Sequence, residues 1–136
     1  MELDGYSFVL LKRGPRASEY SDEELDGLQE QHLAHLGSMR EQGHLLLAGP
    51  FSDQADETLR GFCLYRTSVE ETRRLAESDP SVRAGRMAVD VMGWWTKRGS
   101  LPFCPRFGDH PPMLPFTSLT DAAASAAVRL VTPSFR

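Results

Sequence analysis

His32 combines the side-chain chemistry of a proton carrier with a position inside an apolar pattern. Histidine serves as a general acid or base near neutral pH because the unperturbed pKa of an imidazole is about 6.5. Leu28 and Leu36 lie one turn before and one turn after His32, which puts its imidazole on the apolar face of a predicted helix. A core histidine whose ring nitrogens bond the backbone fits the same pattern, so a purely structural role stays open.

Asp79 directly precedes Pro80, and this pair is typical of the first residues of a helix. The carboxylate accepts hydrogen bonds from free backbone amides, and proline suits the first helical position. A carboxylate in that place can also bond an imidazole, which fixes the tautomer and raises the basicity of the other ring nitrogen. Asp79 therefore has a structural interpretation and a functional one, and the two are compatible.

Two further polar residues are candidates for substrate binding. His35 lies one turn after His32, and it could share the same face of the helix. Both histidines together with Asp79 could bind a metal, but this loose spacing fixes no complete ligand set, and we expect no metal. Arg13 ends a predicted strand and could meet an anionic substrate, although a solvated surface role is the commoner one for arginine.

The segment Gly49-Pro50-Phe51 follows another predicted strand and is expected to bend its end. It is either a plain turn or a pocket wall, in which the backbone amide of Phe51 or Ser52 holds an oxyanion. Trp94 and Trp95 are neighbours on a predicted strand, so their side chains point to opposite faces. Trp94 is the candidate for the pocket, although core packing explains either residue.

Composition and missing motifs disfavour several classes of function. The net charge of −4 is mild and no basic patch is interleaved with aromatic residues, which disfavours nucleic acid as a partner. A membrane partner is not expected, because no apolar run approaches the ~20 residues of a membrane span. There is no glycine-rich phosphate loop or Gly-x-Ser-x-Gly elbow, and neither Cys63 nor Cys104 has an activating neighbour. We expect a cytoplasmic protein.

These candidate residues are carried by a regular succession of predicted elements. Capping boxes at Ser21–Glu24 and Ser68–Glu71 begin two helices, and Gly43 ends the first of them. Strands are expected at 6–12, 44–48, 59–66 and 87–95, and helices at 22–42, 68–78 and, as a short turn, 79–85. The resulting β-α-β-β-α-β order is the ferredoxin-like split βαβ arrangement of the α+β class.

In such a fold both helices cover one face of the sheet, and the apolar side chains on the other face need cover. A homodimer that packs sheet on sheet, as a dimeric α/β-barrel-like assembly, is the expected solution. We expect this domain to span residues 1–97 and an irregular, Pro- and Phe-rich C-terminal extension to span residues 98–136. An alanine-rich stretch at 120–131 could form a short helix, and the phenylalanines of the extension favour docking, for instance on the partner subunit.

Several segments, in order and at these separations, resemble the YCII-related family. They are Phe8 to Pro15, His32 to Leu36, Gly43 to Phe51, and Ser68 to Pro80 followed by Val82 to Gly85. The resemblance covers about residues 5 to 97 and implies a ferredoxin-like dimer with no organic cofactor. It also implies that His32 and Asp79 form the active-site pair. Some members of the family are thought to act in the breakdown of chlorinated aromatics or in secondary metabolism.

Together with these residues, the resemblance favours a small, cofactor-free enzyme. His32 would act as general base or acid and Asp79 would hold and polarise it, in an isomerisation, elimination or dehydration of a small metabolite. An aromatic or polyketide-like substrate suits a pocket that contains Phe51 and Trp94. The alternatives are a non-catalytic module that binds a small ligand or another protein, and a cofactor-free oxygenase of the dimeric α+β barrel type.

Overall fold

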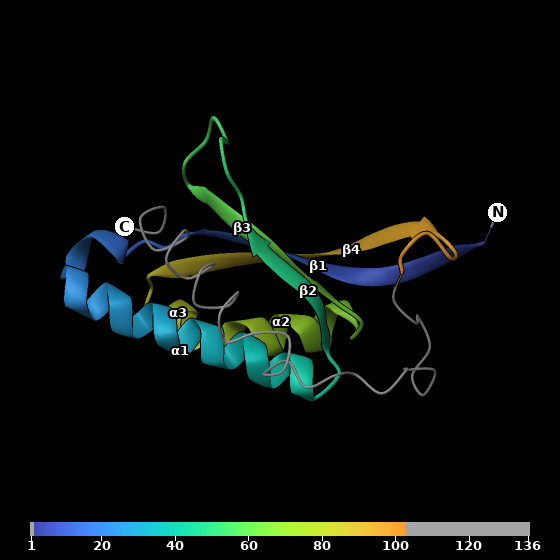
Figure 1. Cartoon of the computed structure of the whole chain (residues 1–136), viewed down its shortest axis with the longest axis horizontal. Helices are drawn as coiled ribbons and strands as arrows, with labels where there is room; N and C mark the ends of the chain where they lie inside the picture. Colours follow the sequence, from blue (N-terminus) through green and yellow to red (C-terminus); the bar gives the residue numbers. More distant parts are fainter. Residues whose placement is uncertain (1, 103–136) are drawn as a thin grey trace.

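The computed structural model describes residues 2–102, and their helices and strands follow the predicted β-α-β-β-α-β order (Figure 1). The elements are β1 (Leu3–Arg13), the 3₁₀ helix η1 (Ala17–Glu19), α1 (Asp22–Glu41), β2 (Leu45–Pro50), β3 (Leu59–Tyr65), α2 (Val69–Glu77), α3 (Pro80–Arg83) and β4 (Met87–Lys97). None of the helices within this range has the length and apolar character needed to cross a membrane. The alanine-rich stretch and the phenylalanines of the predicted extension lie outside the described residues.

The four strands form one antiparallel sheet in the order β2-β3-β1-β4. β1 runs through its middle, where Val9 pairs with Cys63 of β3 on one side and with Val91 of β4 on the other. The three α-helices lie together against one face of this sheet, as Figure 1 shows. The arrangement is consistent with a ferredoxin-like α+β fold.

Two strands are longer than the sequence pattern predicts, and a predicted bend is wrong. β1 begins at Leu3 and β4 runs to Lys97, and the two extend together because Leu3 pairs with Lys97. β2 continues through Gly49 to Pro50 without the expected bend. Proline is tolerated there because β2 is an edge strand, in which one missing backbone donor can face solvent.

The capping residues predicted from the sequence lie where α1 begins and ends and where α2 begins. Ser21 Oγ accepts a hydrogen bond from the Glu24 amide at 3.2 Å, and Glu24 Oε1 accepts one from the Ser21 amide at 3.1 Å, which confirms the first capping box. Ser68 Oγ caps α2 by accepting from the Glu71 amide at 3.2 Å. Gly43 follows the end of α1 with a φ of +81°, a left-handed conformation that glycine adopts easily.

The main core fills the space between the helices and the sheet. Its buried members come from all four strands and from α1 and α2; they are Val9, Leu11, Met39, Leu45, Cys63, Tyr65, Ala76 and Met87. Removing apolar surface from water stabilises the fold by roughly 25 cal/mol per Å². This core holds α1 against the sheet, and the buried side of α1 also carries two polar residues, Gln29 and His32.

A second apolar cluster, which we call the open-face cluster, lies on the sheet face opposite the helices. It comprises Tyr6, Leu46 and Leu64, with Phe8, Leu47 and Leu101 packed against them. Phe8 also stacks on Phe62, with ring centroids 5.0 Å apart. Met92 and Trp94, by contrast, are 43% and 40% exposed. The described residues therefore leave part of this apolar face in water.

The chain keeps contact with the sheet beyond the predicted domain limit at residue 97. Arg98 forms ion pairs with Glu2 at 2.7 Å and with Asp4 at 3.0 Å. Leu101 then packs against the open-face cluster. The described part of the chain thus returns from the end of β4 to the N-terminal part of β1.

Candidate active site

His32 and Asp79 are 47 residues apart in the sequence but meet in the interior between α1 and α3. His32 lies on the buried side of α1, and Asp79 caps the N-terminus of α3. The distance from His32 Nδ1 to Asp79 Oδ2 is 2.5 Å, and each residue is only 3% exposed. The fold therefore brings together the two residues that the family resemblance pairs.

The other carboxylate oxygen of Asp79 keeps the helix-capping role. Asp79 Oδ1 accepts hydrogen bonds from the backbone amide and from the hydroxyl of Ser81, each at 2.9 Å. Ser81 Oγ also lies 3.3 Å from Met87 Sδ, at the start of β4. A single carboxylate thus holds an imidazole and the start of α3 at the same time, so the structural interpretation of Asp79 does not compete with the functional one.

The surroundings of Asp79 favour its ionised form. Burial acts to raise the pKa of this carboxyl, but the hydrogen bond and charge of His32, with the two hydrogen bonds from Ser81, lower the pKa below its ordinary value. An ionised carboxylate only accepts hydrogen bonds, so His32 must donate through Nδ1. Nε2 is then the unprotonated nitrogen of the neutral ring.

His35 lies one turn after His32, at the edge of this site. The pKa of His35 lies below its ordinary value, chiefly because of burial. The charge of His32 also lowers this pKa, whereas the charge of Asp79 and a hydrogen bond to the Leu75 backbone act to raise it. Because charge effects weaken with distance, these interactions place His35 near the pair. Its Nε2 is buried and has no hydrogen-bond partner among the described residues.

Two more titratable neighbours of Asp79 are buried. Arg86 is 3% exposed, and burial lowers its pKa to about 10 while the Asp79 carboxylate acts to raise it, so the guanidinium stays charged at neutral pH. Burial, and the Asp79 charge to a lesser degree, raises the pKa of the Cys63 thiol to about 12. A thiol with so high a pKa is not a nucleophile at neutral pH.

Three buried polar residues of this region are not among the sequence predictions: Gln29, Ser81 and Arg86. Gln29 interrupts the apolar side of α1 one turn before His32, which is a signal that the sequence carries. Ser81 stands two residues after the capping aspartate, and the side chain of a helix cap usually accepts a hydrogen bond from the backbone amide at that position. Arg86 offers no local signal, because its burial depends on the packing of distant elements.

The predicted aromatic residues lie on the other face of the sheet. Phe51 packs beside Phe62, with ring centroids 6.0 Å apart, and Trp94 packs beside Tyr6, with centroids 6.2 Å apart. Tyr6 belongs to the open-face cluster, whereas the His32–Asp79 pair lies on the helix-covered side. Within one chain the structure does not bring Phe51 and Trp94 to the pair.

The other predicted binding residues also differ in whether they lie beside the His32–Asp79 pair. Ser52 and Arg13 are exposed, and Arg13 sits at the very end of β1. His35 is the predicted binding residue that the fold places beside the His32–Asp79 pair. In residues 2–102, no three His, Cys, Asp or Glu side chains are grouped so that they could hold a metal ion.

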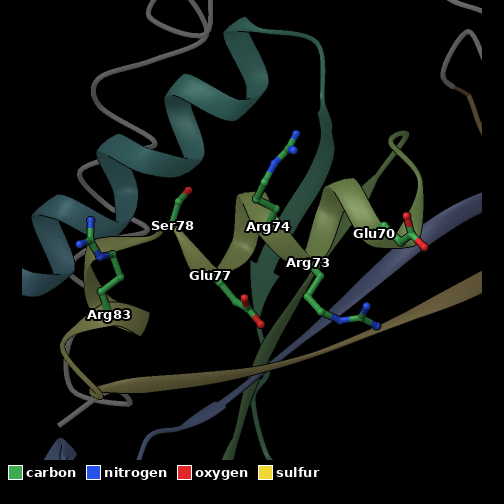
Figure 2. Close-up of a pocket in the computed structure, with 6 residues that line it drawn as sticks. All are labelled: Glu70, Arg73, Arg74, Glu77, Ser78 and Arg83. Carbon is green, nitrogen blue, oxygen red and sulfur yellow. The ribbon is translucent and has the colours of Figure 1, made fainter.

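A hollow of about 420 Å³ opens on the outer side of α2 and α3 (Figure 2). It is lined by Glu70, Arg73, Arg74, Glu77, Ser78 and Arg83. Its acidic and basic residues on α2 follow one another three and four positions apart, as on a solvated helix face, and Arg74 also forms an ion pair with Glu71. Neither His32 nor Asp79 lines this hollow, so we do not regard it as the candidate site.

The protein is a small α+β domain with a buried histidine–carboxylate pair, and comparison with known families identifies the family to which it belongs. A family model described as the YCII-related domain matches residues 7–95, which is more than half of the chain. The chain belongs to the YCII-related family.

Among solved structures, the chain is similar to 5-chloro-2-hydroxyhydroquinone dehydrochlorinase from Burkholderia phenoliruptrix AC1100, determined in complex with 2,5-dihydroxybenzoquinone. The sequences are 22% identical, the match covers 65% of this chain and 92% of that chain, and the TM-score is 0.46. No curated protein matches the sequence.

His35→Gln should reduce the loss of stability in mild acid. Burial lowers the pKa of His35 in the folded protein, so the unfolded chain binds a proton more readily near the ordinary pKa of about 6.5. Neutral His35 therefore makes its full contribution to the free energy of unfolding above that pH. This contribution is lost as the pH falls towards the pKa of His35 in the folded protein. Between about pH 7.5 and about pH 5.5, the free energy of unfolding in urea should drop more for wild type than for the variant. Equal drops would contradict this role of His35.

Proposed function

We propose that the chain is a small acid–base enzyme in which His32 transfers protons and Asp79 positions it. The observation that carries this proposal is the 2.5 Å contact between His32 Nδ1 and Asp79 Oδ2 inside the fold. A carboxylate bonded to Nδ1 holds the tautomer in which Nε2 is unprotonated and can accept a proton. The resemblance of the sequence to the family implies the same pair.

The reaction that suits this equipment begins with removal of a proton from a carbon next to a carbonyl group. His32 Nε2 takes the proton, and the Asp79 carboxylate stabilises the imidazolium that forms. Return of the proton to a different carbon completes an isomerisation. Departure of a leaving group from the adjacent carbon completes an elimination, and if that group is hydroxide, the imidazolium protonates it and the reaction is a dehydration. Acid–base transfer supplies about 10²–10⁴-fold, and stabilisation of the enolate oxygen must supply much of the remainder.

Two features of the surroundings suit this role. The pair is 3% exposed, so the proton transfer takes place away from bulk water. Arg86 keeps a positive charge near Asp79, which favours the negative charge that develops on an enolate oxygen. Because the pair is buried, the substrate must be small enough to reach the interior beside α1.

Deuterium exchange tests the proposal across a range of small molecules. A panel of small ketones, β-dicarbonyl compounds and phenols is incubated with the full chain in D₂O and followed by proton NMR. We expect at least one carbonyl compound to exchange its α-protons faster with wild type than without protein. His32→Gln should lower that rate by about 10²-fold or more, because it removes the base.

His44→Gln is the matched control for this experiment. His44 is a half-buried histidine just before β2, beyond the C-terminal end of α1 and outside the pair. It should leave the exchange rate unchanged. Exchange that remains equally fast in His32→Gln, with circular dichroism showing an intact fold, would contradict the proposal.

We also propose that a second copy of the chain covers the open-face cluster. This cluster continues into Met92 and Trp94, which are 43% and 40% exposed. A contiguous exposed apolar patch favours a partner, and two-fold pairing of identical sheet faces is the simplest closed solution. The family resemblance implies the same kind of dimer.

Trp94→Glu and Trp95→Glu form a matched pair for this proposal. The two residues are neighbours on β4, so they point to opposite faces of the sheet, and Trp95 is 65% exposed. A charge at position 94 would be buried in the dimer and should convert it to monomer in analytical ultracentrifugation. A charge at position 95 should leave the mass unchanged. A monomeric wild type, or a dimer that survives Trp94→Glu, would contradict the proposal.

A further inference from the structure

Three hydrogen-bond acceptors follow one another along α1 at intervals of three residues. They are Gln29 Oε1, His32 Nε2 and His35 Nε2, and residues three apart are neighbours on a helix surface. Gln29 is 4% exposed, and its Oε1 is buried with no hydrogen-bond partner among residues 2–102. His35 Nε2 is also buried and has no hydrogen-bond partner among residues 2–102. The acceptors of Gln29 and His35 thus lie one turn before and one turn after the proposed base.

The bonding of His35 decides that its Nε2 is an acceptor. The ring bonds the backbone of Leu75, and because Nε2 has no partner among the described residues, Nδ1 makes that bond. The bond raises the pKa of the ring, as a bond to a carbonyl oxygen does, so Nδ1 carries the proton. Burial lowers the pKa of His35, so the ring is neutral at physiological pH and Nε2 presents a lone pair.

The burial of Gln29 has no structural explanation within the described residues. A buried acceptor without a donor lowers stability, and such atoms are rare in folded proteins. Leu25 and Leu28, on the same helix, show that apolar side chains suit this region of α1. A leucine at position 29 would avoid the cost. A glutamine there fits a group whose acceptor is satisfied when a ligand brings a donor.

We propose that the substrate is a small neutral molecule with at least two hydrogen-bond donors, such as hydroxyl groups, which Gln29 and His35 accept on either side of His32. This inference rests on the proposed function, in which His32 is the base, and it adds what the ligand must present. Gln29 and His35 are then specificity residues that set the position of the substrate along α1. The C–H to be deprotonated faces His32 Nε2 between them.

The same row of acceptors disfavours anionic ligands. The lone pairs of Gln29 and His35 repel a carboxylate or phosphate placed against them, whereas the positive charge of Arg86 acts near Asp79 and not at these two acceptors. A hydroxyl group gains an acceptor in the same place. A site that hydrogen-bonds a hydroxyl discriminates strongly against an analogue that lacks it, because the polar atoms of the site are then left unpaired.

Resorcinol and its methyl ethers test the donor requirement on the full chain. Resorcinol has two hydroxyl donors, 3-methoxyphenol has one and 1,3-dimethoxybenzene has none, while the ring stays the same. We expect the dissociation constant, from NMR titration of the histidine ring signals, to rise about fivefold to tenfold for each hydroxyl lost. Equal affinities across the series, or tightest binding of the dimethyl ether, would overturn the inference.

Gln29→Leu tests the same inference from the side of the protein. It should bind resorcinol about fivefold to tenfold more weakly and yet have a higher Tm, because an apolar group replaces an unsatisfied polar atom. A residue that merely supports the fold would lower the Tm instead. Gln31→Leu, on the exposed side of α1, is the matched control and should leave the affinity unchanged. His35→Leu should repeat the loss of affinity. A lower Tm or an unchanged affinity in Gln29→Leu would overturn the inference.

The two experiments separate this inference from the proposed function. Donor-dependent binding that Gln29→Leu weakens, without any proton exchange, would support the inference and remove the acid–base role of His32. Proton exchange that His32→Gln abolishes, with affinities indifferent to the number of hydroxyl groups, would support the acid–base role and overturn the inference.

Discussion

The packing of α1 against α3 depends on one buried carboxylate. Asp79 is 3% exposed, and burying an ionised carboxylate is costly unless hydrogen bonds replace the water that it loses. Three donors do so: the ring of His32, and the amide and hydroxyl of Ser81. Because one donor comes from α1 and two come from the first turn of α3, the same charge ties the two helices together and orients the imidazole. Removing a donor from either side would leave the charge short of a partner, so the packing of this region and its chemistry share one interaction.

The parts of the fold that local residues determine are the parts that the sequence predicts well. The capping box at Ser21 and the end of α1 at Gly43 depend on residues within one turn, and both are confirmed. The order of strands and helices follows from hydrophobic periodicity in the same way. The lengths of β1 and β4 could not be predicted, because each strand extends as far as its partner does, from Arg13 opposite Met87 back to Leu3. The continuation of β2 through Pro50 depends likewise on its place at the sheet edge, which is a property of the whole fold.

The candidate site is harder to predict because it joins residues from distant parts of the chain. Periodicity puts His32 on the buried side of α1, but only the family resemblance pairs it with Asp79. Strand alternation shows which residues share a face and not which face the helices cover, so the sequence assigns Phe51 and Trp94 to a pocket although they pack on the open face. Gln29 escapes prediction because one glutamine in an apolar pattern looks like a tolerated exception, and its unsatisfied oxygen is visible only in three dimensions.

The tautomer of His32 tests most directly the claim that Asp79 holds the imidazole with Nε2 ready to accept a proton. Nitrogen-15 NMR of the ring distinguishes the Nδ1–H form from the Nε2–H form. We predict the Nδ1–H form in the neutral ring of the wild-type protein. In Asp79→Asn the amide oxygen keeps the two Ser81 donors, so the amide NH₂ faces His32 Nδ1 and should force the proton onto Nε2. A wild-type ring protonated on Nε2, or a tautomer that is the same in a folded Asp79→Asn protein, would contradict the account.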